Sequence, residues 1–162
     1  MKTTFTLSTI LGLSLLTPYA SAQESRPYLT LDAAKTGAAA CEAYASENSL
    51  RVAISIKDRG GRLIHFMRMD DVYQKQVEFA GIKAETAATT PLSTKRLGEV
   101  AQPGSALAGL VYVPGLNGIE GGEPITLKTG YNIGGVGVSG ASPAQDGECA
   151  RAAVAAINKS YE

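Results

Sequence analysis

The sequence predicts an α+β domain built on an antiparallel sheet of about five strands with helices on both faces. Two observations lead to this fold class. Segments in which apolar residues recur at helical spacing are separated by short segments of alternating polarity, in the order helix, two strands, helices, two or three strands, helix. The strands come in pairs joined by turn residues, which is typical of antiparallel pairing. No internal repeat or linker divides the chain, so we expect one domain.

Residues 1–22 are predicted to be a secretory signal peptide. Lys2 provides a positive start, residues 5–16 are apolar, and Ala20-Ser21-Ala22 supplies the small side chains of a cleavage site. The apolar segment is shorter than the roughly 18 residues that a membrane-spanning helix needs. We therefore expect cleavage after Ala22, no insertion in the membrane, and a secreted domain comprising residues 23–162.

The secreted domain is predicted to begin with a helix followed by a β-hairpin. Thr30 is a good N-cap for a helix that runs to about Ser49 and carries a stripe of small apolar residues. Segment 52–57 alternates in polarity, and the turn Asp58-Arg59-Gly60-Gly61 separates it from segment 62–69, which carries bulky side chains on both faces. Both segments are therefore predicted to be strands.

The middle of the chain is predicted to be helical and then irregular. A second helix, 73–89, has a narrow stripe of small residues that permits close packing, and Pro91 ends it. A short helix at 94–100 leads into the glycine-rich segment 104–124. We expect this segment to be an ordered loop with a helical turn at 106–110.

The end of the chain is predicted to form a second hairpin and a last helix. Residues 125–127 and 131–139 flank the turn Thr129-Gly130. Ser142-Pro143-Ala144-Gln145 combines a capping box with proline at the first helical position. A helix should therefore begin there and run to about Ser160.

The two cysteines lie on the predicted core faces of the first and last helices. Cys41 shares a stripe with alanines of the first helix, and Cys149 shares one with Ala153 and Ile157. Export places them in an oxidising compartment. We expect a Cys41–Cys149 disulfide that packs the terminal helices together, and the alternative is two buried free thiols.

Composition excludes several classes of function. The chain has 15 Lys and Arg against 15 Asp and Glu and no basic run, which argues against nucleic-acid binding. Nothing indicates a membrane surface. One histidine and two cysteines cannot form a multi-histidine metal cluster or a Cys-x-x-Cys-His attachment site, so covalent c-type haem is excluded.

The glycine-rich run 135–140 matches two motifs in part. Its G-x-G-x-x-G spacing is that of a dinucleotide-binding loop, and Ser139 stands in part of a hydrolase nucleophile elbow. No further strand with an acidic residue follows the last helix, and Ala141 stands where the elbow needs glycine. We therefore interpret the glycines as positions where other groups approach the strand closely.

His65 is the candidate ligand residue of the second predicted strand. One face of that strand carries Leu63, His65, Met67 and Met69, and the other carries Ile64, Phe66 and Arg68. Imidazole and thioether are both haem-ligand types. The alternative is a histidine partly buried under a helix in a methionine-filled core. Arg68 and Lys83 are candidates for anion binding or for surface salt bridges.

Four motifs in order resemble one family. Residues 58–70 resemble the GG-x-L…F-x-RMD signature of the GlcG/HbpS family, the haem-binding-protein-like domain also found at the C-terminus of PduO. Residues 83–87 look like its K-A-x-T-A helix, 121–125 like its GG-x-P-I segment, and 133–141 like its IGGVGVSGA strand. The helix containing Asp146 and Ala150 also fits, so the resemblance covers about Leu29 to Ile157.

The resemblance implies a layered α+β domain that assembles into homo-oligomers in a bacterial setting, and hence a periplasmic location for an exported chain. Some members bind haem non-covalently and modulate a sensor kinase, whereas others belong to glycolate or propanediol operons without a settled activity. This sequence departs from the usual pattern at His65, where a small residue is common, and at 72–76. The axial ligand is therefore not transferred by motif.

These observations lead to three functional hypotheses. The first is an exported protein that binds haem b non-covalently, for sequestration or sensing, with His65 as axial ligand, Met67 beside it, and Arg68 or Lys83 pairing with propionates. The second is a non-catalytic oligomeric module that binds an envelope sensor protein. The third is an enzyme acting on a small organic acid or aldehyde, for which the sequence offers no acid–base pair.

Overall fold

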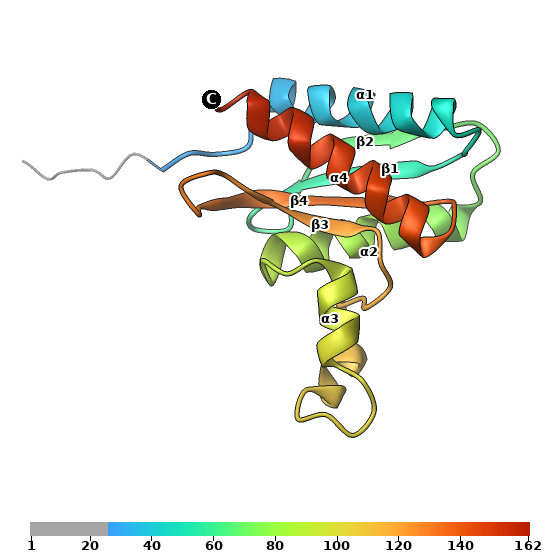
Figure 1. Cartoon of the computed structure of the whole chain (residues 1–162), viewed down its shortest axis with the longest axis vertical. Coiled ribbons are helices and arrows are strands. Elements are labelled where there is room, and N and C mark those ends of the chain that lie inside the picture. The colour runs from blue at the N-terminus through green and yellow to red at the C-terminus, as the bar shows by residue number, and fades with distance from the viewer. Residues whose placement is uncertain (1–25) are drawn as a thin grey trace, which may run out of the picture.

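The structure is a computed structural model that describes residues 26–162, so the predicted signal peptide lies outside the described residues. Four strands pair antiparallel in the order β2-β1-β4-β3. Helices α1 and α4 lie side by side on one face of the sheet, and α2 covers the other (Figure 1). The elements are α1 (Leu31–Glu47), β1 (Ala53–Asp58), β2 (Leu63–Arg68), α2 (Gln74–Thr89), α3 (Thr94–Val100), the 3-10 helix η1 (Ala108–Tyr112), β3 (Gly122–Thr126), β4 (Asn132–Ser139) and α4 (Pro143–Lys159).

The α+β class and the helices on both faces are confirmed, but the predicted number of about five strands is wrong. The sheet of the described residues has four strands, two from each predicted hairpin. The glycine-rich segment that precedes β3 forms η1 and loops, in keeping with the predicted ordered loop with a helical turn. The prediction allowed two or three strands after the middle helices, and the structure forms two there.

The helix ends follow the capping signals of the sequence. The Thr30 hydroxyl accepts a hydrogen bond from the Ala33 amide at 3.2 Å and begins α1. Ser142 and Gln145 form the predicted capping box of α4, with Pro143 at the first helical position. Each cap satisfies amide groups that have no partner inside the helix.

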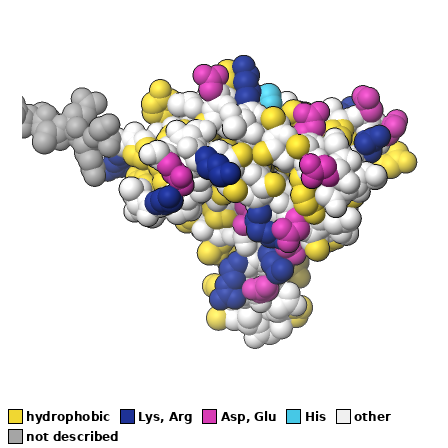
Figure 2. All heavy atoms as spheres, turned by 45° about the horizontal axis from the view of Figure 1, so that its top comes forward, with side chains coloured by type: hydrophobic (Ala, Val, Ile, Leu, Met, Phe, Trp, Pro, Cys, Tyr) yellow, Lys and Arg dark blue, Asp and Glu magenta, His cyan; other side chains and the backbone are white. Residues whose placement is uncertain are grey.

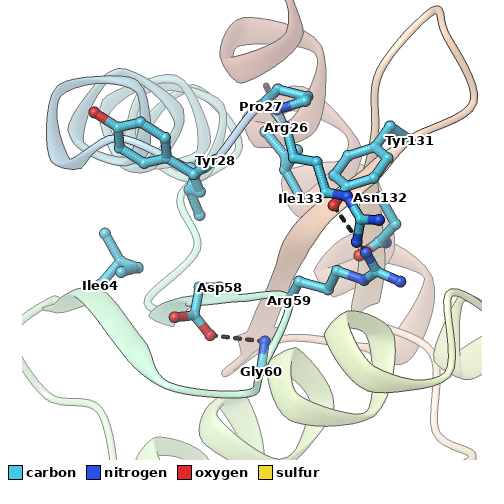
Figure 3. Close-up of a pocket in the computed structure, with 11 residues that line it drawn as sticks. Arg26, Pro27, Tyr28, Asp58, Arg59, Gly60, Ile64, Tyr131, Asn132 and Ile133 are labelled. Atoms are coloured by element: carbon cyan, nitrogen blue, oxygen red, sulfur yellow. Dashed lines mark hydrogen bonds between the residues drawn. The ribbon is translucent and has the colours of Figure 1, made fainter. Parts of the chain in front are cut away.

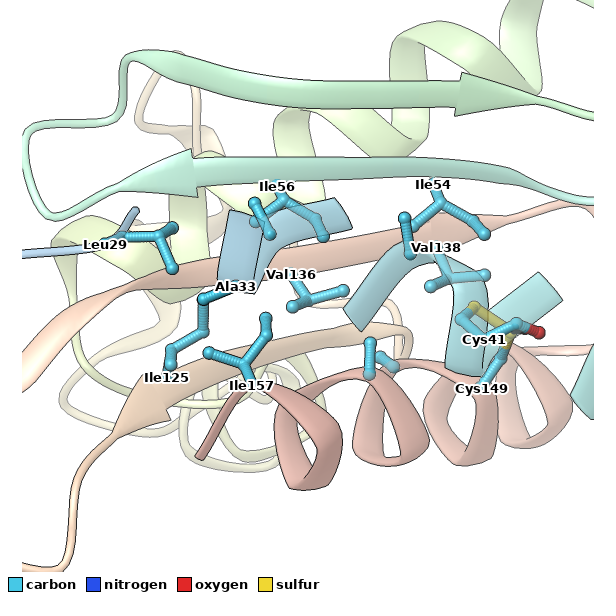
Figure 4. Packing of buried hydrophobic residues seen from close by; sticks show 14 of the residues in the cluster. Leu29, Ala33, Cys41, Ile54, Ile56, Ile125, Val136, Val138, Cys149 and Ile157 are labelled. Atoms are coloured by element: carbon cyan, nitrogen blue, oxygen red, sulfur yellow. Dashed lines mark hydrogen bonds between the residues drawn. A yellow bond between two sulfur atoms is a disulfide. The ribbon is translucent and has the colours of Figure 1, made fainter. Parts of the chain in front are cut away.

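The main core lies between the sheet and the pair formed by α1 and α4 (Figure 4). Ile54 and Ile56 of β1 and Val136 and Val138 of β4 point into it and are fully buried. Ile157 of α4 packs on Gly37 of α1, where an added Cβ would lie 2.6 Å from the isoleucine. This close approach of α1 and α4 confirms that the terminal helices pack together.

The other face of the sheet is shaped for close contact with α2. An added Cβ at Gly137 would lie 2.1 Å from the Ala80 carbonyl oxygen, and one at Gly135 would lie 2.5 Å from the Ala88 amide. Small residues on α2 match these glycines on β4. The interpretation of the glycine run as a close-packing surface therefore agrees with the structure.

A disulfide joins α1 to α4. Cys41 and Cys149 are bonded, both are fully buried, and the bond spans 108 residues of sequence. The predicted pairing is confirmed. In the chain-entropy model, a loop of this length stabilises the folded state by about 4 to 5 kcal/mol.

The segment from α3 through η1 to Gly121 projects from the body as an arm (Figure 1). Charged side chains of both signs gather where the arm meets the body (Figure 2). There Glu120 accepts ion pairs from Lys95 and Arg151, and Arg151 also contacts Glu123 and Glu148. Farther out the arm exposes large apolar side chains, namely Leu107, Tyr112, Val113 and Ile119.

Candidate functional site

His65 and Met67 share one face of the edge strand β2, as predicted. His65 pairs with Ile56 and Met67 pairs with Ile54, and residues directly opposite in an antiparallel pair share a face. Met67 packs against the core under α1, and both residues are partly buried. The imidazole therefore lies at the border between the core and solvent.

Leu63 does not share this face, which corrects the predicted stripe. The register shifts between Ile56 and Lys57, so Leu63 pairs with Lys57. The Lys57 ammonium binds Glu85 of α2 at 2.7 Å, which places Lys57 and Leu63 on the α2 side. A β-bulge inserts one residue and reverses the faces beyond it, and no feature of the sequence indicated it.

Arg68 lies on the opposite face from His65. It pairs with Ala53, which belongs to the small core under α2, and its Nη2 donates to the Val72 carbonyl at 2.7 Å. The guanidinium thus fixes the chain that follows β2. This placement separates Arg68 from the His65 face.

Lys83 does not fit the predicted role in anion binding or in a surface salt bridge. Lys83 is 2 % exposed, and its Nζ donates at 2.9 Å to both Asp146 Oδ2 and the Val138 carbonyl. Asp146 is equally buried, and its Oδ1 accepts from the Ala141 amide at 3.0 Å. A ligand carboxylate cannot reach an ammonium group enclosed in this way.

The Lys83–Asp146 pair is where separate motifs of the sequence meet. Lys83 opens the K-A-x-T-A helix, and Gly121 belongs to the GG-x-P-I segment. A Cβ at Gly121 would lie 2.7 Å from the Lys83 ammonium, and the backbone there has φ +126°, which favours glycine. The motifs contain these residues, but no feature of the sequence indicates that they are in contact.

Burial sets the electrostatics of the pair. Loss of hydration raises the pKa of Asp146, and the Lys83 ammonium opposes this rise. A buried carboxylate is thus costly to keep ionised without its partner. The pair is a structural tie between α2 and α4, which lie on opposite faces of the sheet.

A pocket of about 390 Å³ lies beside β2 at the end of the sheet that carries the β1–β2 turn (Figure 3). Ile64, the neighbour of His65 in sequence, forms part of its wall. The other walls come from the segment before α1, the turn and the start of β4. Sequence reasoning missed this pocket because residues 26–29, 58–60 and 131–133 meet only in the folded chain.

Within residues 26–162, no group of three or more His, Cys, Asp or Glu side chains is placed to hold a metal ion. No helix in the same range is long and apolar enough to cross a bilayer.

Comparison with known proteins identifies the family. A family model described as haem degrading protein HbpS-like matches residues 29–155. This chain belongs to the HbpS-like family. The match covers most of the described domain and all four motifs recognised in the sequence.

Relatives of the HbpS-like chain include one enzyme and two solved structures. The corrinoid adenosyltransferase PduO of Salmonella typhimurium is 38 % identical over 115 residues, which is 70 % of this chain but 34 % of PduO. A PduOC–haem complex is 34 % identical, with a TM-score of 0.76, over 82 % of this chain and 96 % of that one. The HbpS structure is 32 % identical, with a TM-score of 0.74, over 83 % and 93 %.

The buried pair generates the first prediction. Lys83→Met and Asp146→Asn should each lower the free energy of unfolding by about 3 to 5 kcal/mol, because each leaves one buried charge without its partner. The double variant should lose less than the sum of the two. Urea denaturation of the wild type, the two single variants and the double variant measures the coupling energy between Lys83 and Asp146. Strictly additive losses of stability would contradict the prediction.

A control variant and a pH test accompany these measurements. Lys75→Met removes an exposed ion pair with Glu78 on the same helix and should change stability little. In Lys83→Met the pKa of Asp146 is higher folded than unfolded, so the folded state holds the extra proton. Stability of that variant should fall as pH rises between the two pKa values and recover on acidification.

Proposed function

We propose that this chain is an exported protein that binds haem non-covalently as b-type haem, for sequestration or sensing. The observation that carries the proposal is the partly buried imidazole of His65 on an edge strand, in a fold shared with a PduOC–haem complex at 34 % identity. His65 is the sequence's only histidine. Imidazole is a common axial ligand of haem iron.

The donor set favours His65 over other side chains. Cys41 and Cys149 are bonded to each other and buried, so neither offers a thiolate. Met67 packs into the core, and its thioether would have to leave that packing to reach an iron. Neutral imidazole would ligate the iron and orient the macrocycle against the edge of the sheet, and one protein ligand suits a five-coordinate or weakly six-coordinate iron.

A haemin titration of the purified protein provides the second prediction. The wild type should give a saturable shift of the Soret band, and His65→Ala should weaken binding at least tenfold and alter the spectrum. Leu63→Ala, on the opposite face of the same strand, is the matched control and should bind as the wild type does. Unchanged spectra and affinity in His65→Ala would reject the ligand assignment, and no saturable shift in the wild type would reject haem binding.

A non-catalytic oligomeric module that modulates an envelope sensor protein is the second candidate function. The arm supports it, because Tyr112 is 85 % exposed and Leu107 and Val113 are also uncovered. Exposed apolar side chains that lie together mark interaction surfaces. An enzyme on a small organic acid or aldehyde has less support, since the chain matches only a third of PduO and the described residues bring no acid–base pair into the pocket beside β2.

Homo-oligomer formation is the third prediction. Helix α2 lies over β4, β1 and β3, and Leu63 on the α2 side of the edge strand β2 is 58 % exposed. Covering this strand with a second copy would bury apolar surface and protect an open sheet edge. Light scattering should give a mass above that of the monomer at micromolar concentration, and a monomer mass would contradict it.

Export to the periplasm is the fourth prediction, and it rests on the signal-like segment 1–22. Intact-mass measurement of the exported protein should show a chain beginning near Gln23. A mature chain that begins elsewhere, or retention of the segment, would count against it.

A further inference from the structure

We infer that the pocket at the β1–β2 turn is a binding site for the carboxylate of a small organic acid with an apolar body. The pocket, of about 390 Å³, is lined by two arginines and by apolar side chains. No motif in the sequence pointed to it. Its chemistry follows from the side chains that the fold brings together.

The cationic part of the site consists of Arg26 and Arg59. Both side chains reach into the same space beside the Tyr131 ring, one from the segment before α1 and the other from the β1–β2 turn (Figure 3). Arg59 Nη1 donates to the Tyr131 hydroxyl at 2.9 Å, and its guanidinium carbon lies 5.1 Å from the ring centroid. Arg59 is exposed, so its guanidinium can pair with a ligand carboxylate while it keeps its contact with Tyr131.

The other polar groups leave room for a ligand anion. Asp58 is the acidic residue of the wall, and its Oδ1 accepts from the Gly60 and Arg62 amides at 2.8 and 3.0 Å, which ties it to the turn. Asn132 Oδ1 is buried and has no hydrogen-bond partner, while its Nδ2 donates to the Gly134 carbonyl at 3.2 Å. A hydroxyl or N–H group of the ligand would satisfy this oxygen.

The apolar side chains of the lining indicate what kind of body the ligand has. Leu29 and Ile133 are almost fully buried there, and Ile64 is partly buried. These side chains form no hydrogen bonds, so they favour an apolar ligand body over a fully hydrated ion such as phosphate. A carboxylate with an aromatic or aliphatic body therefore matches both ends of the pocket.

The wall before α1 is held in place without a ligand. The Tyr161 hydroxyl donates to the Tyr28 carbonyl at 2.8 Å and accepts from the Thr30 amide at 3.0 Å. Tyr161 follows α4, so the end of the chain fixes the segment that carries Arg26. A preformed wall lowers the entropy cost of binding.

Two sources can supply this carboxylate. One is a free organic acid. The other is a propionate of haem bound at His65, because Ile64 of the pocket wall precedes His65 on β2; this second source rests on the proposed function. In either case Arg59 replaces Arg68 and Lys83 as the carboxylate partner.

The test uses benzoate and its neutral analogue benzamide as probes of the exported protein in calorimetric or NMR titrations. Benzoate should bind saturably and at least tenfold more tightly than benzamide. Arg59→Gln should weaken benzoate binding at least tenfold, because it removes the exposed guanidinium that pairs with the carboxylate. Arg62→Gln, in the same turn but outside the pocket, is the matched control and should leave affinity unchanged.

A parallel haemin titration distinguishes a free organic acid from a haem propionate as the source of the carboxylate. If haemin displaces benzoate and Arg59→Gln also weakens haemin, the carboxylate is a propionate. If benzoate binds and haemin does not compete, it is a free acid, and this result stands even where haemin fails to bind at all. If Arg59→Gln changes the affinity for neither benzoate nor haemin, the inference is wrong whether or not haem binds through His65.

Discussion

The buried pair formed by Lys83 and Asp146 is the contact on which the arrangement of the layers depends. It joins helices on opposite faces of the sheet, and both residues are 2 % exposed. Removing two ions from water is expensive, so the pair depends on the attraction between the two ions and on the hydrogen bonds that each makes to the backbone. Gly121 leaves the space for the ammonium, the Val138 carbonyl of β4 accepts a hydrogen bond from Lys83, and the Ala141 amide before α4 donates one to Asp146.

Because helices pack closely on both faces of the sheet, the positions open to ligands lie at its edges and at the end that carries the β1–β2 turn. Glycines of β4 let α2 approach one face, and the disulfide and Gly37 bring α1 and α4 together on the other. Little adjustable space remains inside, so the open positions are the edge strand β2, the β1–β2 turn and the arm. His65 and the arginine-lined pocket both lie at this hairpin, which is rigid because β1 is a central strand. Binding residues placed on a turn above a rigid scaffold are a common arrangement.

Local features of the fold could be predicted because they depend on neighbours in sequence. Thr30 and Ser142 mark helix starts through hydrogen bonds within one turn, and the change from helical to alternating spacing located β1 and β2. The bulge opposite Lys57 could not be predicted, since it depends on how two strands pair. It moved Leu63 to the other face while His65 and Met67 kept the expected one.

The sequence by itself determined the class of fold, the family and the disulfide. The chain has two cysteines, which helical periodicity places on the core faces of the first and last helices, so one intramolecular pairing is available to them. Only the tertiary structure decided that Lys83 is enclosed by Asp146 and that Arg26 and Arg59 share a pocket with Asn132. The physical reason is that burial and electrostatic environment come from residues distant in sequence: Lys83 meets Asp146 across 63 positions and Arg59 meets Tyr131 across 72.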